Sequence, residues 1–218
     1  MRHGPERLAI AYDDPHRAEK DVLFARINRD REEAGVPPVA YEPRAALVGD
    51  LFCLDTAMEG AFGHWDLRGR APFLRWAQAG GVDFHTENAA SYSVSSGRVD
   101  RPLTELLLKT HAEMMAERPP ADGHRRAVLD PNHTHVGIGL AVVGGEFRMT
   151  EEFTAVAFEW IEIPSRAVRA GEWASFAGLV SSGTDIETIE VRHEPPPRPL
   201  SLHDLQQRGS YAYPRIVR

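Results

Sequence analysis

The fold class is decided by residues 135–163, whose sequence is HVGIGLAVVGGEFRMTEEFTAVAFEWIEI. Every second residue from Val136 to Val142 is a large aliphatic one, which is the period of a strand with one buried face. Gly144-Gly145 is a two-residue hairpin signal, and the runs 147–153 and 156–163 have the composition of two further strands. This segment therefore predicts a meander of antiparallel strands.

The residues before the meander have the periodicity of helices. Asp13-Asp14-Pro15 supplies a helix start and Gly35 a C-terminal cap, and Asp122 is expected to cap a short turn. Helices are expected at 15–33, from Pro43 to Met58, at 72–79, from Pro102 to the Pro119-Pro120 stop, and at 124–129. Helices followed by strands favour a layered α+β domain.

The last quarter of the chain differs in character. Strands are expected at 173–180 and 186–193, and Pro195-Pro196-Pro197 is a stiff extended spacer. Ser201 and Asp204 have the spacing of a capping box for a short helix ending at Gly209. We divide the chain into an N-terminal arm (1–14), an α+β domain (15–164) and a β-rich C-terminal extension with a short final helix (165–218).

Composition excludes several classes of protein. A net charge of −7 argues against a nucleic-acid-binding surface, and no apolar run is long enough to cross a bilayer, so we expect neither a nucleic-acid partner nor an integral membrane protein. Cys53 is the single cysteine and rules out an intrachain disulfide. The first residues, MRHGP, lack the pattern of a signal peptide, so we expect either that a leader has been removed or that the protein never had one.

Ten histidines make metal binding the first chemical question. Four residues have suitable contexts for a divalent ion such as zinc: His64, Glu87, Glu117 and His124. Their spacing is wider than a linear metal signature, so from the residues alone a packed His124 and a solvated Glu117, in the last turn of its helix, remain the leading interpretation. His133 and His135 form a second candidate pair, for which packing at a strand entrance is favoured.

Five motifs then occur in the order known from one family. They are REEAGVPPV at 31–39, Gly63-His64 followed by Gly69, Pro72 and Arg75, ENAA at 87–90, GHRRAVL at 123–129, and THVGIG at 134–139. Together they resemble the bacterial type of the CAP superfamily, named for cysteine-rich secretory proteins, antigen 5 and pathogenesis-related proteins. The resemblance covers about residues 17–160 and implies a three-layer α-β-α sandwich, followed here by the C-terminal extension.

The resemblance also implies a cavity lined by two histidines and two glutamates that binds zinc or another divalent cation. Carried over, these residues are His64, Glu87, Glu117 and His124. The chain departs from the family pattern at Met114, where a tryptophan is usual, and at Thr86, where a glycine precedes the EN pair.

Two functions follow as expectations. The first is an extracytoplasmic, periplasmic or secreted, binding or structural module without catalytic activity, which has a protein partner or a lipid-like ligand and acts as an accessory subunit of a larger assembly. The alternative is a metal-dependent hydrolase in which the cavity holds zinc and one glutamate serves as general base.

Overall fold

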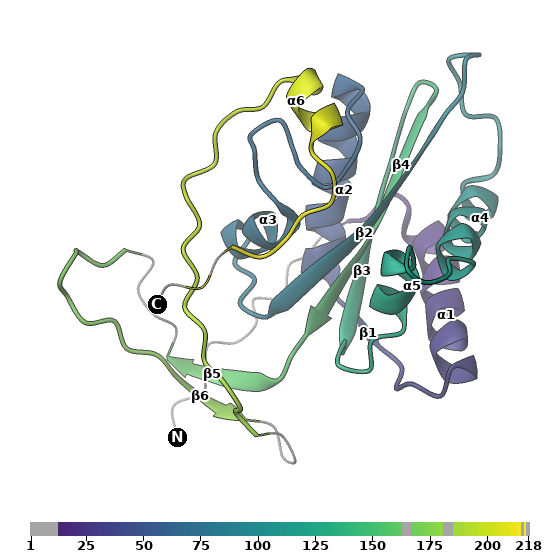
Figure 1. The fold of residues 1–218 in the computed structure, drawn as a ribbon. Coiled ribbons are helices and arrows are strands. Elements are labelled where there is room, and N and C mark those ends of the chain that lie inside the picture. Colours follow the sequence, from purple (N-terminus) through teal and green to yellow (C-terminus); the bar gives the residue numbers. More distant parts are fainter. Residues whose placement is uncertain (1–12, 163–166, 181–184, 215, 217–218) are drawn as a thin grey trace.

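A computed structural model describes residues 13–162, 167–180, 185–214 and 216. Its elements, drawn in Figure 1, are α1 (Arg17–Glu33), β1 (Ala40–Tyr41), α2 (Pro43–Glu59), α3 (Pro72–Gln78), β2 (Phe84–Ser93), α4 (Leu103–Met115), α5 (Gly123–Val128), β3 (His135–Val143), β4 (Glu146–Ala155), β5 (Phe158–Glu162), β6 (Ala177–Val180) and α6 (Leu202–Gln207). Within these described ranges, every helix falls short of the length and apolarity that a bilayer crossing needs.

A four-stranded sheet in the order β1-β3-β4-β2 forms the central layer. The short β1 runs parallel to β3, whereas β3–β4 and β4–β2 are antiparallel pairs. Figure 1 shows α2 and α3 on one side of this sheet and α1, α4 and α5 on the other. The predicted three-layer α-β-α sandwich is therefore confirmed.

The face of β3 toward α2 is built from glycines, because the helix lies directly on the strand. A Cβ added to Gly137 would lie 2.2 Å from the backbone nitrogen of Ala46, and one added to Gly139 would lie 2.4 Å from the carbonyl carbon of Gly49. No side chain fits in that space. The alternation of aliphatic residues and glycine in β3 thus allows α2 to approach the sheet closely.

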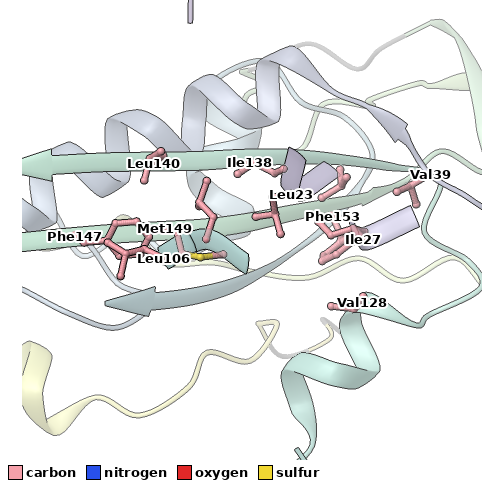
Figure 2. Packing of buried hydrophobic residues seen from close by; sticks show 12 residues of the cluster. Leu23, Ile27, Val39, Leu106, Val128, Ile138, Leu140, Phe147, Met149 and Phe153 are labelled. Atoms are coloured by element: carbon pink, nitrogen blue, oxygen red, sulfur yellow. The ribbon is translucent and has the colours of Figure 1, made fainter. Parts of the chain in front are cut away.

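The opposite face of the sheet carries the main hydrophobic core, shown in Figure 2. Val136 and Ile138 of β3 are fully buried there, as the alternation predicted. Burying such apolar side chains is the largest favourable contribution to folding. The cluster includes Leu23 and Ile27 from α1, Leu106 and Leu107 from α4, and Phe147, Met149 and Phe153 from β4.

Arg31, at the end of α1 and the first residue of the motif at 31–39, is fully buried. Its Nε donates to the carbonyl of Pro37 at 2.7 Å, so the guanidinium fixes the extended chain after the helix. Its two terminal nitrogens donate to carbonyls on the far side of the layer, those of Val128, Asp130 and His133. The motif at 31–39 therefore ties α1 to the segment that follows α5.

His111 of α4 lies fully buried between two carboxylates. Its Nδ1 is 2.6 Å from Oε1 of Glu151 on β4, and its Nε2 is 2.8 Å from Oδ2 of Asp30 on α1. Burial alone would lower the pKa of His111, but Glu151 and Asp30 together outweigh it and raise that pKa. The network joins α1 and α4 to β4.

Several predicted boundaries are wrong. The first helix begins at Arg17, two residues after the expected start, and Asp14 accepts hydrogen bonds from the His16 amide and the Lys20 amine. Asp122 stands before α5 but makes no side-chain capping bond. The sequence analysis did not predict β2, a strand of ten residues.

The extension contains less sheet than expected. β6 begins at Ala177 and pairs with β5 in a separate two-stranded sheet. Residues 186–193 form no strand: their side chains are exposed, and Arg192 alone forms a bridge, with Ile216. The predicted capping box of Ser201 and Asp204 does open α6, which ends at Gln207. Most of the N-terminal arm, residues 1–12, lies outside the described residues.

Candidate functional site

A cavity of about 900 Å³ lies at the outer edge of β2. Its walls come from the loop after α2, from β2 itself, from the start of α5, and from the C-terminal segment between Leu202 and Tyr213. All four residues that the sequence analysis selected line this cavity, namely His64, Glu87, Glu117 and His124. They enter it as two histidine–glutamate pairs.

The first pair joins the loop after α2 to β2. Nδ1 of His64 lies 2.9 Å from Oε1 of Glu87, whose side chain is completely buried. Oε2 of the same carboxylate accepts a hydrogen bond from Arg75 of α3, which also donates to the His64 carbonyl at 2.8 Å. Burial raises the pKa of Glu87, and the charge of Arg75 opposes that rise.

The second pair joins the end of α4 to the start of α5. Oε1 of Glu117 lies 2.5 Å from Nδ1 of His124, and its Oε2 accepts the peptide N–H of His124 at 3.0 Å. Partial burial would raise the pKa of Glu117, but the hydrogen bonds from His124 and Arg125, together with the charge of His124, outweigh it and lower that pKa. Glu117 follows the end of α4 at Met115, so its predicted place in the last helical turn is wrong. Its carboxylate takes the capping role expected of Asp122.

In both pairs the carboxylate contact leaves the imidazole able to bind a metal. An Nδ1–H donated to a carboxylate fixes the neutral tautomer and leaves the Nε2 lone pair for a metal. The glutamates suit a different role, since both oxygens of each one already accept hydrogen bonds. In the ranges that the structure describes, no three His, Cys, Asp or Glu side chains converge on one ion position. Each histidine of the cavity therefore has its Nδ1 beside a carboxylate, which is the contact that orients a metal-binding imidazole.

A second buried carboxylate, which the sequence did not indicate, lies beside Glu87. Glu152 of β4 lies directly across from Glu87 in the register and is fully buried. Burial raises the pKa of Glu152, as it does for Glu87. On the same face His85 stacks on Trp76, and burial lowers its pKa to about 3, so this imidazole is neutral. Only the pairing of β2 with β4 brings these residues together.

The other candidates from the sequence are packed in the structure. His133 stacks on Phe84 and Phe153, and its Nδ1 lies 2.8 Å from the Ala127 carbonyl. Burial lowers the pKa of His133, which fits the favoured interpretation of a packed residue. Cys53 is buried on α2, and burial raises the pKa of its thiol far above the usual value.

No family model matches this sequence, and no curated protein matches it. Solved structures do match. An extracellular protein containing an SCP domain from Bacillus anthracis aligns over 64% of this chain at 18% identity, with a TM-score of 0.51. An outer surface protein from Borrelia burgdorferi aligns over 67% of the chain at 12% identity, with a TM-score of 0.52. The alignments span 41% of the Bacillus chain and 98% of the Borrelia chain.

At these identities the likeness shows the fold. The chain has the α-β-α fold of SCP domains, which is the fold of the CAP superfamily, and the resemblance seen in its five motifs is confirmed at that level. Both neighbours are described as proteins of the cell exterior, one extracellular and one of the outer surface.

Proposed function

We propose that this chain is an extracytoplasmic binding module whose cavity takes a divalent cation, with zinc as the reference ion. His64 and His124 would hold the ion through Nε2, and Glu87 and Glu117 would orient the two rings. One observation carries the proposal: each imidazole in the cavity has its Nδ1 held by a carboxylate. A bound ion would supply a positive centre for a donor group of the module's ligand.

The hydrogen bonding of the glutamates favours binding over catalysis. A general base needs a carboxylate oxygen within reach of the attacking water. In Glu87 one oxygen accepts from His64 and the other from Arg75. In Glu117 both oxygens are bonded to groups of α5. Neither residue therefore has an oxygen reserved for activating water.

The extension supports a protein partner. Its described residues expose large apolar side chains, including Trp173 with 98% of its surface accessible. Others are Phe176, Leu179, Ile186, Ile189 and Val191. Exposed apolar side chains mark a site of association where they gather in one patch. We therefore place the partner contact on the extension, with the module serving as an accessory subunit, and the cation in the cavity of the SCP domain.

Zinc titration by calorimetry on the metal-stripped protein tests the cation site. We expect the wild type to bind one equivalent with a Kd of about 1 μM or below, because two imidazoles oriented by carboxylates are prepared for the metal. The His64→Ala/His124→Ala double variant is expected to lose this binding. Glu117→Gln, which keeps both imidazoles, should weaken binding by about 10- to 100-fold.

His203→Ala is the matched control. His203 is exposed on α6 and does not line the cavity, so this substitution removes an imidazole and leaves the site intact. It should bind zinc like the wild type. Equal binding by the wild type and the double variant would place zinc elsewhere and contradict the proposal, as would a wild type that takes up none.

A further inference from the structure

The C-terminal segment forms one wall of the candidate site. After the proline spacer the chain passes α6 and returns along β2, which is an edge strand of the sheet. Figure 1 shows this yellow segment running beside β2 and α3. Several residues between Leu202 and Tyr213 line the same cavity as the two histidine–glutamate pairs. A site in the SCP domain is thus completed by residues outside that domain.

The segment is fixed to the loop that carries His64. The Leu200 amide donates to the Leu67 carbonyl at 2.9 Å, and the Arg208 guanidinium lies 4.2 Å from the ring centre of Trp65. Leu205 of α6 is buried, with 4% of its surface exposed. These contacts hold the segment against the loop that carries His64.

Tyr211 reaches the first pair directly. Its hydroxyl lies 2.7 Å from Oγ1 of Thr86 and accepts the peptide N–H of Glu87 at 2.8 Å. Its ring meets the His64 imidazole edge to face, with 5.1 Å between ring centres. Burial raises the pKa of Tyr211 to about 12, so the hydroxyl is neutral. A single side chain therefore contacts both members of the pair.

Tyr213, two residues further on, also binds the backbone of β2, but at His85, outside the His64–Glu87 pair. Its hydroxyl donates to the carbonyl of His85, and its ring stacks on Phe73 and Phe84 at 5.2 and 5.3 Å. Tyr211 and Tyr213 thus meet Glu87 and His85, which are also two residues apart on β2. The segment runs antiparallel to the strand, and its two tyrosines satisfy peptide groups on the free edge of β2.

We propose that Tyr211 is a positioning residue of the cation site, through which the C-terminal segment sets the orientation of His64. This inference rests on the proposed function, because it assigns one more residue to the same site. His64 lies in a loop without helix or strand, so the direction of its ring depends on side-chain contacts. Glu87 holds one ring nitrogen and Tyr211 packs against the ring itself.

The two imidazoles give the test an internal comparison. Among the described residues, Tyr211 has a ring or hydrogen-bond contact with His64 and Glu87, and none of either kind with His124 or Glu117. A substitution of Tyr211 should therefore change the environment of His64 and leave that of His124 unchanged. A general loss of folding would change the environments of both histidines.

The experiment measures the imidazole ¹⁵N and ¹H resonances of both histidines in the metal-free, full-length protein. Tyr211→Leu removes the ring and the hydroxyl, and we expect the His64 resonances to shift while those of His124 keep their wild-type positions. Tyr211→Phe keeps the ring, so its shifts should centre on the amides of Thr86 and Glu87. Tyr213→Phe, the matched control in the same segment, should leave both histidines unchanged.

The same variants are then titrated with zinc. Tyr211→Leu should lower the affinity by on the order of tenfold, and Tyr213→Phe should not change it. Unshifted His64 resonances in Tyr211→Leu would overturn the inference, and so would equal shifts at His64 and His124. A wild type that binds no zinc would contradict the proposed function, while the resonances of the metal-free samples would still decide whether Tyr211 positions His64.

Discussion

Gly137→Ala is expected to lower the free energy of unfolding by about 3 kcal/mol. The added Cβ would lie 2.2 Å from the backbone nitrogen of Ala46 and 2.5 Å from the carbonyl carbon of Ala45. These are backbone atoms of α2, so no side-chain rotation relieves the clash. The helix must move away from the sheet, which also loosens its packing on β4. Urea unfolding followed by circular dichroism measures the effect.

Gly123→Ala is the control for this substitution. Gly123 opens α5, and a Cβ added there meets no atom within 4 Å. Alanine also favours the helix over glycine by up to about 1 kcal/mol, so the variant should be as stable as the wild type or slightly more stable. Equal destabilisation by the two alanines would show that close packing of α2 on β3 does not explain the glycines of this strand.

His111→Gln is expected to destabilise the protein by about 3–5 kcal/mol at pH 6, because it removes a buried cation from between two carboxylates. Asp30 and Glu151 face His111 from α1 and β4. Their remaining partners are Arg26, which donates to Asp30 at 2.8 Å, and Asn88, which donates to Glu151 at 2.9 Å. Arg26 carries a charge but is half-exposed and pairs with Asp30, and Asn88 is neutral, so Glu151 would lose its charged partner.

The loss should depend on pH in a defined direction. The pKa of His111 is raised in the folded state, so its protonation stabilises the fold fully below the unfolded pKa of about 6.5. That contribution is lost as the pH rises through the folded pKa. The difference in unfolding free energy between the wild type and His111→Gln should therefore shrink above pH 6.5. A difference that stays constant or grows over that range would contradict this account, and His203→Gln serves as the exposed control.

The sequence was sufficient for most of the fold because its strongest signals are local. The alternation from Val136 to Val142 and the hairpin at Gly144-Gly145 identified β3 and β4, and helical periodicity identified α2 and α4. β2 has no such alternation, since polar residues lie on both of its faces. Glu87 lies beside Glu152 on one face and Asn88 contacts Glu151 on the other. Partners supplied by β4 make this possible, and no local pattern reveals them.

The candidate site was predictable in its residues but not in its pairing. The motifs contain His64, Glu87 and His124, the resemblance adds Glu117, and the structure brings all four to one cavity. His64 and Glu87 are 23 positions apart, and their contact depends on how the loop after α2 meets β2. Tyr211 is 124 positions from Glu87 and lies outside the five motifs. Its place in the cavity depends on the path of the extension, which composition and spacing do not define.

We propose that the two imidazoles of this cavity share a divalent cation, and a crystal grown with zinc tests this most directly. An anomalous difference map at the zinc absorption edge shows where the ion lies and which atoms bind it. We predict one strong peak in the cavity, about 2.0–2.1 Å from Nε2 of both His64 and His124, with Glu87 and Glu117 still bonded to the Nδ1 atoms. A cavity without a peak, or an ion bound by the glutamates with the imidazoles turned away, would contradict it.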